Sequence, residues 1–347
     1  MVVPDPRRQT GRMKILVLGG TSFLGRAYVT DLLGRGHEVT TFNRGRSGPD
    51  QPGAEAVRGD RNSPADLERL VADRRWDAVV DTSPQQPHAV ALSTGLLEPR
   101  TGHYTLVSSI HAYADWGSVP IDEDSTRHPC PADTPADQPA GNHLKAGCER
   151  ALLERFGPER SLILNCGLLI GPHENTGRLP SWLERIAKGG RVLAPGRPDR
   201  AIQAIDARDL AAFGADLLEQ GTAGRYLTTS PIGAVTLGDL LTACVEATGG
   251  GAGLSWTDEA LLLAADVQPW TELPMWAPDS PDWSAIWQAD TGRARRAGLR
   301  CRPIAETVRD TWAWLCERGL ATEPYRQGDT VLGIDPEKER KLLGGTG

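Results

Sequence analysis

The chain has 347 residues, of which 39% are hydrophobic and 24% charged, as in an ordinary globular protein with one large or two fused domains. Its formal net charge of -7 disfavours contact with phosphate backbones, so we expect no nucleic-acid partner. Six scattered cysteines, without a Cys-x-x-Cys pair or a histidine cluster at zinc spacing, predict reduced thiols, a cytoplasmic location and no metal site. No apolar run approaches the roughly 18 residues of a membrane span, so no membrane association is expected.

The first half of the chain alternates apolar strands with helices, after a leader over residues 1–12 that we expect to be flexible. The expected strands cover residues 14–20, 37–44, 54–60, 76–83, 103–109 and 161–171, and the expected helices cover residues 23–36, 63–75, 87–100 and 141–157. Repeated strand–helix–strand units imply right-handed crossovers and a parallel sheet covered on both faces. Residues 13–171 are therefore predicted to form a Rossmann-type α/β domain with a doubly wound parallel sheet.

The amino-acid composition changes after residue 171, where proline, glycine and tryptophan become frequent. We expect residues 172–327 to form a smaller C-terminal substrate-binding lobe. Within it, a helix and a strand over about 201–230 should return to the main sheet, and 236–250 and 303–319 should be amphipathic helices. The polar segment 328–347 is predicted to be a loosely held tail.

A glycine-rich loop, "LGGTSFLG" over residues 18–25, follows the first strand and opens the first helix. Gly19 permits a tight turn, and Gly25 permits close packing of the helix on the sheet. The backbone N–H groups at such a helix start face an anionic pyrophosphate. Ser22 stands where the usual pattern has its middle glycine. The loop predicts a dinucleotide site.

The end of the second strand, "FNRGR", bears on which dinucleotide binds. An NAD-preferring site usually has an acidic residue there for the ribose 2′-hydroxyl, whereas this chain has Asn43, Arg44 and Arg46. Guanidinium groups suit a 2′-phosphate. NADP(H) is therefore favoured as the cofactor, and NAD(H) stays possible.

These motifs and several later ones resemble the short-chain dehydrogenase/reductase superfamily, in its extended and atypical branch of NAD-dependent epimerases and dehydratases. The resemblance runs from about Lys14 to Gly319 and includes "GGTSFLG", "RGD", "LVSSIHAYAD", "LLIGPHE" and "IQAIDARDLA". The cofactor-binding residues that it implies are Gly19, Gly20, Thr21, Ser22, Phe23, Leu24, Gly25, Asn43, Arg44, Arg46, Asp60, Thr82, Ser83, Lys145 and Cys166. It also maps the catalytic serine onto Ser109.

The resemblance fails at one catalytic position. In the family, an active-site tyrosine precedes its lysine by four residues on one helix face, and the lysine lowers the tyrosine's pKa. Lys145 maps onto the lysine, but Gly141 stands at the tyrosine position. Three explanations stay open: a substitute acid, chemistry that needs no tyrosine, or a protein that binds a dinucleotide without turnover.

The candidate substitute acids follow Ser109 on the next loop. His111 is attractive because imidazole titrates near neutrality, and Tyr113 maps to a tyrosine that shapes the substrate pocket in the family. His143 is less favoured, since it points about 200° away from Lys145 around a helix. Asn165 and Cys166 replace a common arginine–proline pair. We interpret Cys166 as a packing thiol, because no base is obvious beside it.

The substrate is expected at the carboxyl ends of the strands, facing the C-terminal lobe. Candidate substrate-binding residues are Gln85, Ser109, His173, Arg178, Trp182, Arg200 and Gln203, with Ser83 nearby. Arg178 and Arg200 would hold an anionic group. The tryptophans at 270, 276, 283 and 287 either line an aromatic pocket or pin a loop onto the body.

The leading hypothesis is an NAD(P)-dependent oxidoreductase, epimerase or dehydratase acting on a small polar metabolite, in a tailoring step of specialised metabolism. The alternatives are a non-redox lyase, isomerase or cyclase in the same pocket, and an inactive dinucleotide-sensing protein. The resemblance further implies a homodimer through the helices near residues 88–98 and 142–156.

Overall fold

The computed structural model describes residues 11–116, 120–135, 137–138, 141–280, 283, 285–327 and 329–344. The chain divides into two compact units, which are described separately. The first contains residues 1–114, 123–166 and 210–226, and the second contains residues 115–122, 167–209 and 227–347. Our expected leader, residues 1–12, falls largely outside the described residues.

The first unit is built on a seven-stranded sheet with the order β11-β6-β5-β4-β1-β2-β3. Its strands are β1 (Lys14–Leu18), β2 (Glu38–Asn43), β3 (Glu55–Arg58), β4 (Trp76–Asp81), β5 (Thr101–Ser109), β6 (Ser161–Cys166) and β11 (Gly224–Thr228). The neighbouring pairs from β3 through β6 all run parallel. This confirms the predicted Rossmann-type α/β sheet, whose strand order reverses between β1 and β4.

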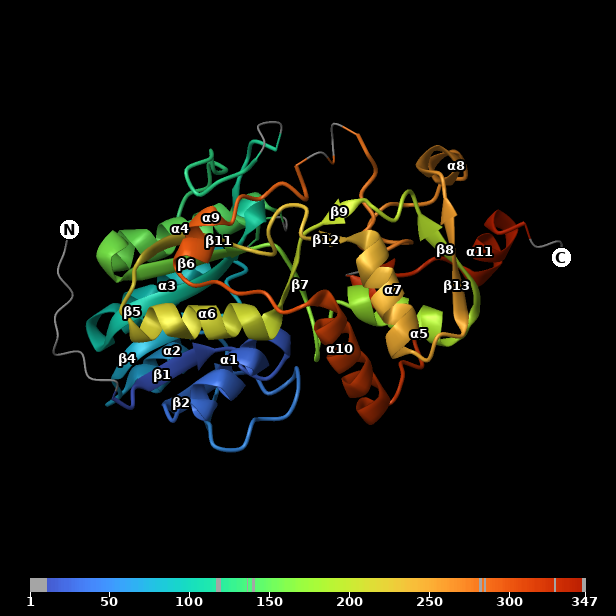
Figure 1. Cartoon of the computed structure of the whole chain (residues 1–347). Helices are drawn as coiled ribbons and strands as arrows, with labels where there is room; N and C mark the ends of the chain where they lie inside the picture. The colour runs from blue at the N-terminus through green and yellow to red at the C-terminus, as the bar shows by residue number, and fades with distance from the viewer. Residues whose placement is uncertain are drawn as a thin grey trace. The chain divides into compact units, whose positions relative to one another are not determined.

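Helices cover both faces of this sheet. They are α1 (Phe23–Gly34), α2 (Pro64–Val71), α3 (Pro87–Leu97), α4 (His143–Phe156) and α6 (Ala207–Glu219), with short 3-10 turns η1 (Glu98–Arg100), η2 (Ile110–Ala112) and η3 (Pro158–Arg160). Helices α1 and α6 lie on one face, and α2, α3 and α4 lie on the other (Figure 1). Strands β1 and β4 are buried almost throughout, because a parallel strand between two helical layers has no solvent-facing side.

The second unit is smaller in sheet content and forms a core of its own around Leu183, Leu240 and Trp276. Its strands are β7 (Leu168–Ile170), β8 (Gly190–Pro195), β9 (Ala201–Ile202), β10 (Ala204–Asp206), β12 (Val235–Thr236), β13 (Ala252–Thr257), β14 (Arg326–Gln327) and β15 (Thr330–Val331). Its helices are α5 (Arg178–Ala187), α7 (Leu237–Ala247), α8 (Glu259–Ala264), α9 (Gly292–Arg296), α10 (Ile304–Arg318) and α11 (Pro336–Leu342).

Two expectations about the chain's organisation were wrong. The strand expected over 161–171 breaks at Gly167, where β6 ends and β7 pairs with β10 instead. A Cβ at Gly167 would lie 2.8 Å from the Thr229 side chain, so only glycine allows this close approach. The tail expected from residue 328 contains helix α11, which is anchored because the buried carboxylate of Glu339 binds Arg185 at 2.6 Å.

The helix expected over 63–75 begins as predicted but ends early. Ser63 caps it by accepting a hydrogen bond from the Asp66 N–H at 3.3 Å. It stops at Val71, because Ala72 has an extended ψ of 123° and Asp73 a φ of 54°. Among the described residues, none of the helices combines the length and apolar character that a membrane crossing requires.

Candidate active site

The glycine loop between β1 and α1 presses its backbone against neighbouring elements. Gly19 and Gly20 have φ values of 112° and 102°, which favour glycine. A Cβ on Gly19 would lie 2.7 Å from Oγ1 of Thr82, and a Cβ on Gly25 would lie 2.6 Å from the backbone nitrogen of Gly20. Thr82 in turn donates to the Leu18 carbonyl at 3.1 Å. Side chains at these glycines would push the loop away from the strand ends.

The amino terminus of α1, which this loop leads into, carries no side-chain cap. Ser22 occupies the N-cap position in an extended conformation without bonding the helix N–H groups. Phe23, the first helical residue, has a strained φ of 39°. An uncapped helix start offers backbone N–H donors of the kind that bind a pyrophosphate.

The end of β2 is tied to the same loop through Asn43. Its Nδ2 donates to the Gly19 carbonyl at 3.3 Å, and its Oδ1 accepts from the Gly45 N–H and from Arg58, each at 2.8 Å. Arg58 also forms an ion pair with Asp50. Arg58 is the first residue of the "RGD" motif, and its contact with Asn43 was not predicted.

The basic side chains after β2 remain on the surface. Arg44 and Arg46 are both exposed, and Arg44 lies 4.0 Å from Asp60. Asp60 accepts from the Asn62 backbone N–H and side-chain amide, each at 2.9 Å, and these bonds hold the pKa of its carboxyl below the usual value. Thus no carboxylate follows β2 directly, and two guanidinium groups do.

Beneath the ends of β4 and β5 lies a buried ion pair that no local sequence pattern indicated. Arg61 contacts both carboxylate oxygens of Asp81, at 2.8 and 2.7 Å, and donates to the Ser83 carbonyl at 2.9 Å. The Tyr104 hydroxyl donates to Asp81 at 2.9 Å, and burial raises the pKa of that hydroxyl well above its usual value. Asp81 is the last residue of β4, so this network fixes the strand end from which Thr82 and Ser83 continue.

Ser109 ends β5, and its position is fixed by hydrogen bonds. Its Oγ accepts from the His111 N–H at 3.2 Å, and its carbonyl accepts from Asn165 Nδ2 at 3.0 Å. Asn165 also donates to Glu149 at 2.6 Å, and Glu149 forms a buried ion pair with Arg225. The asparagine that departs from the family pattern is therefore part of a buried polar network under Ser109.

Lys145 lies in the first turn of α4, as expected. Its Nζ donates to the Pro84 carbonyl at 2.8 Å, and burial lowers its pKa. Gly141 is not on that helix face, because α4 begins at His143 rather than at residue 141 as expected. Gly141 is exposed, and a Cβ there would lie 2.7 Å from the imidazole ring of His143. The histidine side chain thus occupies the space in which a side chain at 141 would begin.

The two candidate proton donors differ in accessibility. His111 is partly exposed in η2, whereas Tyr113 has 0% exposure and its pKa is raised by burial. The thiol of Cys166 is also buried, and burial raises its pKa to about 11. It donates to the Ser108 carbonyl at 3.0 Å, which fits the packing thiol that we expected.

The five substrate candidates after residue 171 belong to the second unit, and two of them are structural residues. Trp182 has 3% exposure and donates its indole N–H to the Pro274 carbonyl at 2.7 Å. Gln203 has 2% exposure and donates to the carbonyls of Ser230 and Ala289 at 2.7 and 2.9 Å. Both polar groups are therefore used by the fold. Apolar periodicity in the sequence does not separate such a core residue from a pocket residue.

The other three candidates are Arg178, Arg200 and His173. Arg178 lies over the Trp270 ring at 5.7 Å, and its Nε makes no hydrogen bond although it is buried. Arg200 forms an ion pair with Asp279 at 3.1 Å, and the His173 ring lies 5.1 Å from that of Trp314. In the first unit, Gln85 is exposed.

The tryptophan-rich segment packs as part of the body of the second unit. Trp276 and Trp287 have 1% and 5% exposure, and Trp270 lies against Trp283 and Trp287 with centroid distances of 6.3 and 5.7 Å. These contacts favour the interpretation that the tryptophans pin a loop. The described part of the chain holds no group of three or more His, Cys, Asp or Glu side chains placed to bind a metal.

Solved structures with similar folds include enzymes crystallised with nucleotides. The enzyme WbmH from Bordetella bronchiseptica, in complex with NAD+, is 19% identical and has a TM-score of 0.65 over 89% of this chain and 100% of that one. WbmG from the same organism, with NAD and UDP, is 19% identical with a TM-score of 0.66 over 90% and 97% of the two chains. UDP-glucose 4-epimerase from Thermotoga maritima, with UDP-glucose, is 16% identical with a TM-score of 0.65 over 88% and 99%. At these identities the likeness shows the fold.

Sequence comparison assigns the family. A 3-beta-hydroxysteroid dehydrogenase from Mycolicibacterium neoaurum is 42% identical over 69 residues, which are 20% of this chain and 19% of that enzyme. The family model described as the NAD dependent epimerase/dehydratase family matches residues 15–227, well over half of the chain. The match covers the glycine loop, the strand ends at Asp81 and Ser109, and Lys145. The chain belongs to the NAD-dependent epimerase/dehydratase family.

Proposed function

We propose that this protein is an NAD(P)-dependent enzyme of the oxidoreductase, epimerase or dehydratase type that acts on a small polar metabolite. The observation that carries the proposal is the uncapped start of α1, approached by a loop in which Gly19 and Gly25 leave no room for a Cβ. That arrangement fits a pyrophosphate, whose oxygens would accept hydrogen bonds from the uncapped N–H groups at the helix start.

The residues around this loop suit the rest of a dinucleotide. Asn43 is held in place by hydrogen bonds with Gly19 and Arg58. By the family resemblance, Asp60 would contact the adenine and Lys145 would bind the nicotinamide ribose. When bound, the nicotinamide supplies a hydride acceptor or donor. Burial lowers the pKa of the Lys145 ammonium group, and a bound cofactor would bury this group further.

We propose that the cofactor is NADP(H), with NAD(H) possible. An acidic residue at the end of β2 would repel a 2′-phosphate, and the residue there is Asn43. Arg44 and Arg46 are exposed on the next turn, and Arg46 has no ion pair among the described residues. Guanidinium groups bind phosphate with two parallel hydrogen bonds.

For proton transfer we propose Ser109 and His111 as the working pair. Ser109 would orient a substrate oxygen, because hydrogen bonds from the His111 N–H and from Asn165 fix its Oγ and its carbonyl. His111 is adjacent to Ser109 and partly exposed. Tyr113 is the second choice, because a fully buried hydroxyl with a raised pKa exchanges protons poorly near neutrality.

On the substrate side we propose that Arg178 binds an anionic group. Burial lowers the pKa of its guanidinium although the Glu174 carboxylate opposes this shift, and its buried Nε makes no hydrogen bond, so an anion would supply the missing contact. The departures at Gly141 and Asn165 support a tailoring role in specialised metabolism. We further propose a cytoplasmic homodimer formed through α3 and α4, which pack side by side on one face of the sheet.

A non-redox lyase, isomerase or cyclase is the second candidate. The observation in its favour is that Gly141 precedes α4 and leaves no phenol at the family position. This candidate predicts turnover that survives removal of the nucleotide. A dinucleotide-sensing protein instead predicts partner binding that differs between NADP+ and NADPH.

The test is calorimetric titration with NADPH, NADP+, NADH and NAD+, after the absorbance of the purified protein has been recorded at about 260 and 340 nm. Exchangeable binding that prefers NADPH, and an Arg44→Gln/Arg46→Gln variant that loses this preference but keeps NADH affinity, are the expected results. A matched Arg197→Gln/Arg300→Gln variant removes the same charge at exposed positions elsewhere and should leave both affinities unchanged. Tightly retained NAD+ would contradict the NADP preference, and no nucleotide binding at all would refute the redox proposal.

A further inference from the structure

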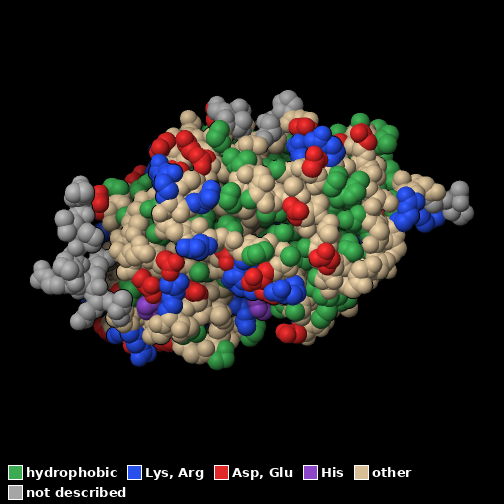
Figure 2. All heavy atoms as spheres, in the orientation of Figure 1, with side chains coloured by type: hydrophobic (Ala, Val, Ile, Leu, Met, Phe, Trp, Pro, Cys, Tyr) green, Lys and Arg blue, Asp and Glu red, His purple; other side chains and the backbone are tan. Residues whose placement is uncertain are grey.

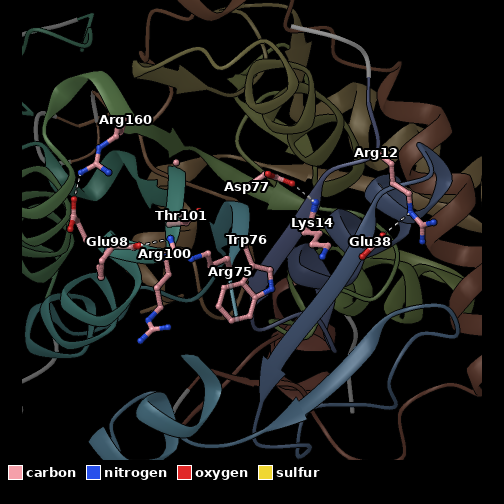
Figure 3. Close-up of a pocket in the computed structure, with 12 residues that line it drawn as sticks. Arg12, Lys14, Glu38, Arg75, Trp76, Asp77, Glu98, Arg100, Thr101 and Arg160 are labelled. Carbon is pink, nitrogen blue, oxygen red and sulfur yellow. Dashed lines mark hydrogen bonds and ion pairs between the residues drawn. The ribbon is translucent and has the colours of Figure 1, made fainter. Parts of the chain in front are cut away.

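A second hollow lies at the opposite edge of the large sheet, where the strands begin. It has a volume of about 690 Å³ and lies among the first residues of three parallel strands, Lys14 of β1, Trp76 of β4 and Thr101 of β5 (Figure 3). Along β1 this edge is about 13 Å from Leu18 and the glycine loop, at roughly 3.3 Å per residue. The hollow is therefore separate from the cofactor edge.

The lining of this hollow is basic, in a chain whose net charge is -7. Five basic side chains and three acidic ones line it. They are Arg12, Lys14, Arg75, Arg100 and Arg160, and Glu38, Asp77 and Glu98. On the face shown in Figure 2, by contrast, basic and acidic side chains are interspersed.

Two of the three acidic side chains form ion pairs, one at each end of the hollow, and the third, Asp77, lies beside Lys14. Glu38 pairs with Arg12 at 3.4 Å, and Glu98 pairs with Arg160 (Figure 3). The carboxylate of Asp77 accepts a hydrogen bond from the backbone N–H of Lys14 at 2.7 Å.

Three cations between these pairs have no carboxylate ion pair with any described residue. They are the ammonium group of Lys14 and the guanidinium groups of Arg75 and Arg100. They come from β1, from the turn before β4 and from η1, so they surround the hollow rather than follow one surface helix.

Other contacts fix the walls of the hollow. The Trp76 indole N–H donates to Oγ1 of Thr40 at 3.3 Å, which holds the ring in the sheet. Arg75 donates to the Pro99 carbonyl at 3.0 Å, which positions its guanidinium at the rim. A preformed rim of this kind reduces the ordering cost of binding an anion.

We propose that this hollow is a second anion site, and that it binds a chain of phosphates such as tripolyphosphate or the triphosphate tail of a nucleotide. Three cations from separate elements match an extended anion with several charges better than they match a single carboxylate. The volume is within the usual range for small-molecule sites, roughly 300–1,000 Å³. This site does not depend on the proposed enzymatic function.

The experiment is calorimetric titration of the full chain with inorganic tripolyphosphate at low salt, with and without saturating dinucleotide. Dinucleotide blocks the glycine loop, which is also an anion site, so binding that persists belongs to the hollow. We expect a Kd below about 1 mM that rises with ionic strength. The variant Arg75→Gln/Arg100→Gln should weaken it at least about tenfold. The charge-matched variant Arg197→Gln/Arg300→Gln, at two exposed arginines outside the hollow, should leave it unchanged.

Three outcomes would overturn the proposal: no tripolyphosphate binding by the wild-type protein, an equal loss in both double variants, or complete displacement by dinucleotide. A parallel titration with ATP identifies the ligand source. Tighter binding of ATP than of tripolyphosphate supports a nucleotide with its base against Pro99, and equal binding supports the phosphate chain alone. The dinucleotide titration alone tests the proposed function, so the two can fail separately.

Discussion

Replacing Arg225 with glutamine should destabilise the first unit, because it leaves a buried carboxylate without its counter-ion. The Glu149 side chain has 1% exposure and that of Arg225 has 12%. Besides Arg225, Glu149 keeps two neutral donors, Oγ of Ser108 at 2.5 Å and Nδ2 of Asn165 at 2.6 Å. Removing one partner of a buried ion pair costs about 3 kcal/mol or somewhat more.

The matched variants are Glu149→Gln and the double replacement Arg225→Gln/Glu149→Gln. The double variant removes both charges, so it should recover at least about 1.5 kcal/mol relative to the sum of the single losses. Urea unfolding gives the free energies, and hydrogen exchange in β6 reports whether the loss lies in the network. Additivity of the two single changes to within about 0.5 kcal/mol would refute the reasoning.

Three further predictions concern packing and reactivity. Gly25→Ala places a Cβ 2.6 Å from the Gly20 nitrogen and should lower dinucleotide affinity at least about tenfold in calorimetry, whereas Gly95→Ala, with nothing within 4 Å, should leave it unchanged. Iodoacetamide at pH 8 should label exposed Cys316 and leave Cys166 unmodified until unfolding, because burial raises the pKa of Cys166 to about 11 and so keeps it protonated; mass spectrometry showing equal labelling would contradict this. Glu339→Ala should free helix α11, and faster hydrogen exchange over residues 336–342 should report it; unchanged exchange would show that the Arg185 contact does not hold the helix.

Local sequence patterns predicted the first unit well. Each of its central strands is a short apolar run between turn residues, and the glycine loop sits between the first strand and helix, as its spacing indicated. Ser63 and Pro64 marked the start of α2 for the same local reason. Patterns of this kind are readable because capping, periodicity and backbone freedom depend on residues a few positions apart.

The errors arose where distant residues decide the conformation. Gly167 ends β6 because Thr229, far along the chain, approaches its backbone, and helix α11 forms because Glu339 reaches Arg185. Trp182 and Gln203, predicted to bind substrate, are buried and donate to backbone carbonyls far along the chain.

By itself, the sequence determined the Rossmann-type class, the dinucleotide loop, the lysine at position 145 and the absence of a tyrosine at position 141. These are properties of residue type and spacing. Only the tertiary structure decided that α4 begins after Gly141, that the His143 ring fills the space beside it, and that Asn165 links Ser109 to the Glu149–Arg225 pair. It also gathered Lys14, Arg75 and Arg100 around one hollow. A contact such as that between Glu149 and Arg225, 76 positions apart, has no signature in local spacing, because it depends on which strands the fold places side by side.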